Sequence, residues 1–238
     1  MQISRFADSH RLDNQTNKCS ATSATARRLT QVLTPASFAR CQLEDVRAGL
    51  RAIVIDRPAQ FAEARALVEQ RYTARGYKSM SDAGRPCPDS NAVTILAMQN
   101  DRTVGTMTLR FDSINGLNVD EAYGAEVRAV REGGGVACEL TCLAVAPEAD
   151  SQATLAVLFR LAWFVADQLG ITDVFIEVNP RHQRFYSRVL DFDVAAGERM
   201  CPRVQAPAVL LHQDLAKIGK RLGGFPPPTR ELRELATA

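Results

Sequence analysis

The chain has 238 residues, of which 46% are hydrophobic and 24% charged, and its formal net charge at neutral pH is +2. This composition is typical of a soluble globular protein with one sizeable core, and it gives no indication of nucleic-acid or membrane binding. The longest apolar run, residues 153–166, is interrupted by Arg160 and is too short to cross a bilayer.

Six cysteines are spread along the chain without a CxxC pair or a neighbouring histidine, a spacing that argues against zinc binding. We therefore expect no metal site, and thiols that stay reduced in the cytoplasm. Cys138 and Cys142 fall within an apolar segment and are expected to be small core residues.

The organisation along the chain predicts one folded domain between two tails. Residues 1–40 carry six Lys or Arg against two Asp, in a segment rich in Ser, Thr and Asn. We expect a mobile basic tail over residues 1–45, a folded domain over residues 46–216, and a Pro-containing C-terminal tail over residues 217–238.

Strands and helices are expected to alternate within the folded domain. Pro58 suits the first turn of a helix, QNDR is a hairpin signal, and the glycines after residue 132 stop a helix. Strands are expected at 50–56, 93–98, 104–111, 136–145, 172–178 and 203–215, and helices at 58–72, 120–132, 151–169 and from Pro180 onward. This order predicts an α/β fold with a mixed sheet and helices on both faces.

Two features stand out in residues 136–167, VACELTCLAVAPEADSQATLAVLFRLAWFVAD. Glu139 lies in the middle of an apolar strand, where burial raises the pKa of a carboxylate and makes it a better base near neutral pH. On a strand it shares a face with Thr141 and Leu143. The alternative is a structural ion pair with an arginine such as Arg110. The loop after the strand, PEADSQATL, contains carboxylates but no glycine, Lys or Arg.

Three blocks, VGTMTLRFDS, CELTCLAV and IEVNPRHQRFYSRVLDF, together with MCPRVQAPAVLL, resemble the N-acyl amino acid synthase family. That family is related to the acyl-homoserine-lactone synthases and has the GNAT acyltransferase fold, with a mostly antiparallel sheet. The resemblance covers about residues 50–214. It implies an enzyme that transfers a fatty acyl chain from an acyl-phosphopantetheine thioester to the amine of an amino acid, with no bound cofactor. Such a lipid product could draw the enzyme to a membrane surface.

The resemblance also implies roles for individual residues. Glu139 would be the base, and Tyr186 would protonate the leaving thiolate, unless Tyr186 is simply a core aromatic. Arg110 would bind the carboxylate of the amino acid, although it could instead pair with Glu139. Further substrate-binding residues would be Thr141, Leu143, Ala144, Val145 and Asn179, with backbone N–H groups of 143–145 polarising the thioester carbonyl.

A basic helix face suggests a docking surface for the donor. Arg181, Arg184 and Arg188 have spacings that share one face and would attract an acidic acyl carrier protein, unless they form an ordinary solvated face. His182 is expected to be a solvated polar residue. The sequence assigns no role to Arg199 or Arg203.

The glycine-free loop favours carrier protein over CoA as donor. CoA-using members of the fold cradle a pyrophosphate with a glycine-containing loop, whereas Glu148 and Asp150 would repel one. Cys142 stands where the acyl-homoserine-lactone synthases carry an arginine, which weighs against S-adenosylmethionine as acceptor. The alternatives are such a synthase, an acetyl-CoA N-acetyltransferase, or a non-catalytic module that binds acyl chains or carriers. The sequence specifies neither chain length nor amino acid.

Overall fold

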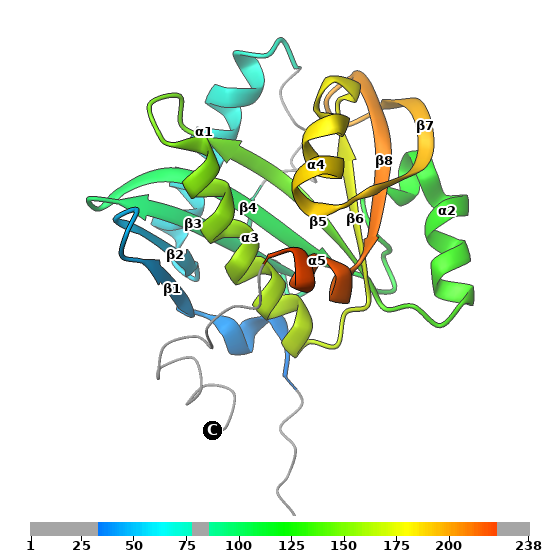
Figure 1. Cartoon of the computed structure of the whole chain (residues 1–238), viewed down its shortest axis with the longest axis horizontal. Helices are drawn as coiled ribbons and strands as arrows, with labels where there is room; N and C mark the ends of the chain where they lie inside the picture. The colour runs from blue at the N-terminus through cyan, green and yellow to red at the C-terminus, as the bar shows by residue number, and fades with distance from the viewer. Residues whose placement is uncertain (1–32, 78–85, 223–238) are drawn as a thin grey trace, which may run out of the picture. The chain divides into compact units, whose positions relative to one another are not determined.

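The computed structural model describes residues 33–77 and 86–222 (Figure 1). Within them, eight strands form one sheet in the order β1-β2-β3-β4-β5-β6-β8-β7. Neighbouring strands are antiparallel, except that β5 and β6 run parallel. The predicted mixed, mostly antiparallel sheet is therefore confirmed.

The predicted elements are present, with ends that shift by a few residues. The strands are β1 (Gln42–Asp45), β2 (Leu50–Val54), β3 (Ala92–Gln99), β4 (Arg102–Phe111), β5 (Ala137–Val145), β6 (Asp173–Val178), β7 (Asp193–Cys201) and β8 (Ala206–Asp214). The helices are α1 (Pro58–Thr73), α2 (Asp120–Glu132), α3 (Ser151–Gln168), α4 (Gln183–Leu190) and α5 (Leu215–Arg221), with 3-10 turns η1 (Pro35–Phe38) and η3 (Pro180–His182).

Three elements were not predicted, and they move the limits of the fold. β1 pairs with β2, and Phe38 and Cys41 before it are buried in the core, so the folded part begins ahead of residue 46. α5 continues past residue 216 to Arg221. β7 is an exposed edge strand whose sequence does not alternate between apolar and polar residues. Alternation of that kind is the pattern that predicts a strand, so β7 could not be recognised from it. The first 32 residues of the predicted basic tail, and residues 223–238, lie outside the described residues.

Helices cover both faces of the sheet, as predicted (Figure 1). α3 packs across β1 to β5 on one face, with Leu158 and Val165 in the main core beside Ile95. On the opposite face α1 packs over β3 to β5 through Phe61, beside Leu96, and α2 packs near β5 and β7. Ile95 and Leu96 are consecutive residues of β3, so their side chains point to opposite faces of the sheet. Ile95 packs on the α3 side and Leu96 on the α1 side.

The sheet is opened at its centre by a bulge and a splay. Thr108 pairs with Thr141 and Thr106 with Ala144, so Cys142 and Leu143 together stand opposite Met107. Cys142 adopts a left-handed φ of 53°, as expected of a bulge. On its other side β5 pairs with β6 only over residues 137–140, and beyond them the two strands diverge. The second half of β5 therefore borders an opening in the sheet.

The bulge also determines which backbone donors face the opening. Ala146, directly after β5, donates its N–H to the carbonyl of Val104 in β4. Successive N–H groups along a strand point to opposite edges, so the Val145 N–H points away from β4, toward the opening.

The close approach of α3 to β4 requires glycine at position 105. A Cβ there would lie 2.5 Å from Thr154 Cγ2 and 3.2 Å from Leu158 Cδ1. We expect Gly105→Ala to lower the free energy of unfolding by about 1–3 kcal/mol through overpacking, measured by urea denaturation. Gly124→Ala in α2 is the control: no atom lies within 4 Å of its Cβ position, so stability should be unchanged or slightly higher. Equal effects of the two substitutions would contradict this account.

Candidate active site

A cavity of about 300 Å³ lies where β5 and β6 diverge. Its size is at the lower end of the range for small-molecule sites. It is lined by β5 residues 139–145, the end of β6 and the start of α4, together with residues of the β7–β8 connection and the C-terminal end of α1. Seven of the predicted residues line it together, namely Glu139, Thr141, Leu143, Ala144, Val145, Asn179 and Tyr186.

Glu139 is held at the buried end of this cavity, with its side chain only 1% exposed. Its Oε2 accepts the backbone N–H of Asn118 at 2.7 Å and that of Val119 at 3.3 Å. Its pKa is raised to about 7, chiefly by burial and also by nearby Glu177, against the opposing effects of Arg203 and the two backbone donors. A carboxylate tuned to this range can accept a proton at neutral pH.

Arg203, to which the sequence assigned no role, connects the elements around Glu139. Its guanidinium is 10% exposed and donates to the carbonyl of Asn118 at 2.6 Å and to Glu121 at 3.3 Å. Its Nη2 donates to Glu177 and lies 4.0 Å from Glu139 Oε1. The same arginine therefore ties the β7–β8 connection to α2 and places a positive charge beside two carboxylates.

Glu177, which the sequence did not single out, lines the cavity beside Glu139. Its side chain is 5% exposed: one oxygen accepts from Arg203, and the other, Oε1, is buried without a hydrogen-bond partner. The sequence offered little signal for it, because a glutamate near the end of an alternating strand is ordinary.

Tyr186 is buried against Phe159, Phe185 and Phe192 in edge-to-face contacts and also lines the cavity. Burial raises the pKa of its hydroxyl, which therefore keeps its proton and is available as a donor. His182 was expected to be freely solvated, but it is half-buried and lines the cavity. Its pKa is lowered by burial and by Arg181 and Arg75.

The thiols near the site are poor nucleophiles. Burial raises the pKa of Cys142 to about 12 and that of Cys201, another lining residue, to about 11. Since the thiolate is the reactive form, neither suits an acyl-cysteine intermediate.

Arg110 lies on the strand next to Glu139, as predicted, but its side chain has a different partner from those considered. It stands directly across from Glu139 in the β4–β5 register, but its guanidinium turns to Asp89 at 2.8 Å and is not part of the cavity lining. The alternative, an ion pair between Arg110 and Glu139, is therefore wrong, because Arg110 forms its ion pair with Asp89. Asn179 lines the cavity, yet its side chain is engaged with Pro207 O and with the N–H of Arg181.

Arg181, Arg184 and Arg188 are exposed, and none of them is part of the cavity lining. Arg184 and Arg188 lie one turn apart on α4, while Arg181 belongs to η3 and reaches the Tyr77 hydroxyl at 3.3 Å. Arg75, at the end of α1, lines the cavity's open end.

The N-terminus of α3 is already capped from within the chain. The Asp150 carboxylate accepts the N–H groups of Gln152 and Ala153 at 2.9 and 3.1 Å. These are donors that an anion at a helix N-terminus would use, so a pyrophosphate placed there would compete with an internal carboxylate.

The described residues contain neither a candidate metal cluster nor a candidate membrane span. No group of three His, Cys, Asp or Glu side chains among them is placed to hold a metal ion. No helix in this part of the chain is both long and apolar enough to span a membrane.

Comparison with known proteins agrees with this fold. A family model described as "N-acyl amino acid synthase FeeM" matches residues 63–214. The structure of FeeM, an N-acyl amino acid synthase from uncultured soil microbes, is 26% identical, covers 72% of this chain and 93% of its own, and has a TM-score of 0.66. A search of curated proteins gives no significant match.

Two more distant structures share the fold. A putative N-acetyltransferase from Lactobacillus plantarum is 20% identical over 70% of this chain and 99% of its own, with a TM-score of 0.50. The acyl-homoserine-lactone synthase LasI is 16% identical over 73% of this chain and 95% of its own, with a TM-score of 0.52.

The fold and the comparisons together define an acyltransferase with the GNAT fold. Within that class, the chain belongs to the FeeM family of N-acyl amino acid synthases, whose model spans more than half of its length. The resemblance seen in the sequence is confirmed.

The raised pKa of Glu139 predicts a pH-dependent cost to stability. Its folded pKa of about 7 lies above the ordinary 4.5, so its stabilising contribution is complete below pH 4.5 and is lost as pH rises through 7. Between pH 5 and 8 the wild type should lose about 2–3 kcal/mol relative to Glu139→Gln, which cannot titrate. Urea denaturation at the two pH values measures this difference.

Glu198→Gln, which removes an exposed carboxylate of β7, is the matched control and should show no such trend. A Glu139→Gln difference that stays constant from pH 5 to 8 would contradict the raised pKa.

Proposed function

We propose that this enzyme joins a fatty acyl chain, delivered as a thioester on an acyl carrier protein, to the amine of an amino acid. The observation that carries the proposal is Glu139: a buried carboxylate with a pKa of about 7, at the inner end of a cavity bordered by a β-bulge, in a chain of the FeeM family. An amine attacks a thioester only as the free base, so the site needs a group that accepts its proton.

The transfer would be direct. The ammonium of the amino acid gives one proton to Glu139, and the free amine attacks the thioester carbonyl, forming the C–N bond. The negative charge that develops on the carbonyl oxygen is stabilised by the backbone N–H of Val145, which points toward the opening. By the same alternation the Ala144 N–H points back to β4. As the C–S bond breaks, the thiolate takes the proton of the Tyr186 hydroxyl, and the second proton of the nitrogen passes to the resulting tyrosinate, so that Tyr186 is neutral again. Glu139 then returns its proton to solvent. The raised pKa values of Cys142 and Cys201 support direct attack over a cysteine-bound intermediate.

The donor is proposed to be a carrier protein because a pyrophosphate at the start of α3 would meet carboxylates instead of free donors. Asp150 already accepts the donors at the start of α3, and the preceding loop adds only another carboxylate, Glu148. Phosphopantetheine on a carrier has one phosphate rather than the additional phosphates of CoA. Cationic and polar groups near the open end, Arg75, Arg181 and His182, offer it an alternative place.

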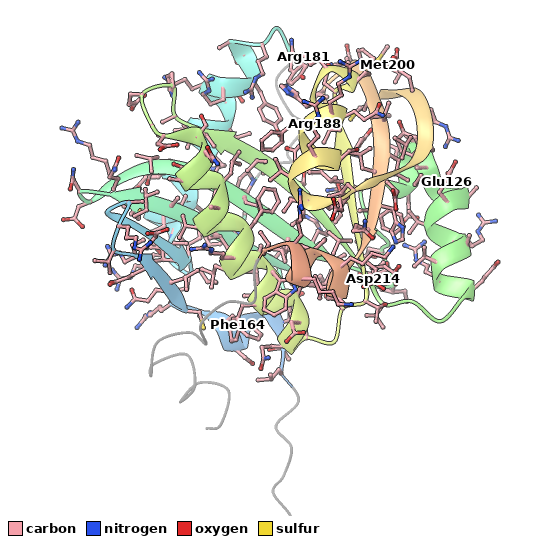
Figure 2. All side chains as sticks on the ribbon, viewed as in Figure 1. Glu126, Phe164, Arg181, Arg188, Met200 and Asp214 are labelled. Carbon is pink, nitrogen blue, oxygen red and sulfur yellow. The ribbon has the colours of Figure 1, made fainter. Side chains whose placement is uncertain are left out.

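Carrier docking is assigned to the exposed basic face of Arg184 and Arg188 on α4, with Arg181 beside it. Figure 2 shows Arg181 and Arg188 at the α4 end of the molecule, and α4 also supplies Tyr186 to the cavity. A carrier seated there would deliver its arm directly to the site, and opposite charge would speed the encounter.

The central experiment is an assay of the purified protein with acyl carrier thioester or acyl-CoA of the same chain, against each of the twenty amino acids. We expect mass spectrometry to detect N-acyl amino acids, formed faster from the carrier thioester. Glu139→Gln should lower kcat/KM by at least about 100-fold, since a general base contributes on the order of 10²–10⁴.

Two outcomes would redirect the proposal. Faster transfer from acyl-CoA would overturn the choice of donor while leaving the acyltransferase intact. Release of acyl-homoserine lactone with S-adenosylmethionine, and no acylated amino acid, would overturn the choice of acceptor.

Charge reversal on α4 tests the docking face separately. We expect Arg184→Glu combined with Arg188→Glu to lower kcat/KM for acyl carrier thioester by about tenfold or more at low salt, and to change little with acyl-pantetheine, which has no carrier. Arg47→Glu, an exposed arginine between β1 and β2, is the control. An equal loss with both donors would show that these arginines act in some other way than by docking a carrier.

A further inference from the structure

The cavity contains a second carboxylate, Glu177, that neither the sequence nor the reaction scheme above uses. It belongs to β6, directly across the splay from β5, and it lines the same cavity as Glu139. Its Oε2 is taken by Arg203, but its Oε1 is buried with no hydrogen-bond partner in the described structure. A buried carboxylate oxygen left without a donor is costly, which makes it a candidate for a ligand's donor.

We infer that Glu177 Oε1 binds the ammonium group of the acceptor and presents it to Glu139. This inference rests on the proposed function and adds the substrate-binding residue that it lacks. At neutral pH an acceptor amine arrives mostly as an ammonium ion, because the pKa of an α-amino group lies above about 7. An ammonium carries three donors and no acceptor, which matches an unpartnered carboxylate oxygen beside a second carboxylate.

The charges around the site support this assignment. The buried end of the cavity contains two carboxylates, Glu139 and Glu177, against the one guanidinium of Arg203. Arg203 is in addition shared with the Asn118 carbonyl and with Glu121. With both cavity carboxylates ionised, this end is one positive charge short of balance, and an ammonium restores it.

The geometry also separates the two carboxylates by role. Glu139 Oε2 is occupied by the N–H groups of Asn118 and Val119, and these donors fix its position for proton transfer. Glu177 Oε1 accepts no backbone N–H and has no hydrogen-bond partner; the weakly donating thiol of Cys201 is the other group beside this carboxylate. After Glu139 has taken one proton, the neutral amine can still donate a hydrogen bond to Glu177 while its lone pair attacks the thioester.

The test compares substrate KM values for wild type and Glu177→Gln, an isosteric change that keeps an oxygen for Arg203 but removes the negative charge. We expect the KM for the amino acid to rise about 10- to 100-fold, the loss expected for a charge-assisted hydrogen bond. The KM for the acyl donor should change by less than about twofold.

Inhibition of the wild type supplies a second measurement that needs no variant. Butylammonium and butyrate have similar size and opposite charge. Butylammonium should compete with the amino acid and inhibit more strongly than butyrate, and Glu177→Gln should lose this preference.

The inference is overturned if product forms but Glu177→Gln leaves the amino acid KM unchanged, or if the KM values of donor and acceptor rise together. It is also overturned if butyrate inhibits the wild type as well as butylammonium does. Failure of the proposed function is a different result: the wild type would then form no acylated amino acid from any donor.

Discussion

The arrangement of the site depends on one buried guanidinium. Arg203 neutralises part of the charge of Glu139 and Glu177 while it donates to the Asn118 carbonyl. The backbone N–H of Asn118 in turn donates to Glu139. Asn118, which precedes α2, therefore accepts a hydrogen bond from the arginine through its carbonyl and donates one to the carboxylate through its N–H. The guanidinium offsets the desolvation of the carboxylates at this depth, since an unpaired buried charge costs several kcal/mol.

The opening that receives these charges is made by backbone geometry. The bulge at Cys142 and the divergence of β6 interrupt the sheet where a continuous ladder would leave no room for a substrate. A broken ladder leaves backbone donors without strand partners, and a site that polarises a carbonyl can use them. The free-energy cost of these unpaired donors is offset by packing elsewhere in the fold, where α3 lies close against β4 at Gly105 and α1 covers the other face.

The sequence predicted the sheet, its helices and Glu139, but not the groups that surround Glu139. Glu139 was recognisable because a carboxylate in an apolar strand is locally anomalous. Arg203 was not, because its contacts with β5 and β6 join segments far apart in the chain and leave no periodic pattern. Arg110 shows the converse: the β4–β5 register does place it opposite Glu139, but Asp89, from a segment that reads only as irregular turn, binds it instead. Register can be inferred from alternation, whereas the choice among competing ion-pair partners depends on tertiary distances.

The charges of the cavity change sign from its buried to its open end, which bears on how an acceptor would be oriented. The buried end is anionic through Glu139 and Glu177, while Arg75 and the neighbouring Arg181 make the open end cationic. A zwitterionic amino acid would be favoured with its ammonium inward and its carboxylate outward, and the reverse orientation would place like charges together at both ends. That orientation brings the nitrogen beside Glu139 and leaves the carboxylate near the cations that would also bind the donor's phosphate. Arg75 is thus better placed than Arg110 to balance the acceptor's carboxylate, since Arg110 is held by Asp89 and does not line the cavity.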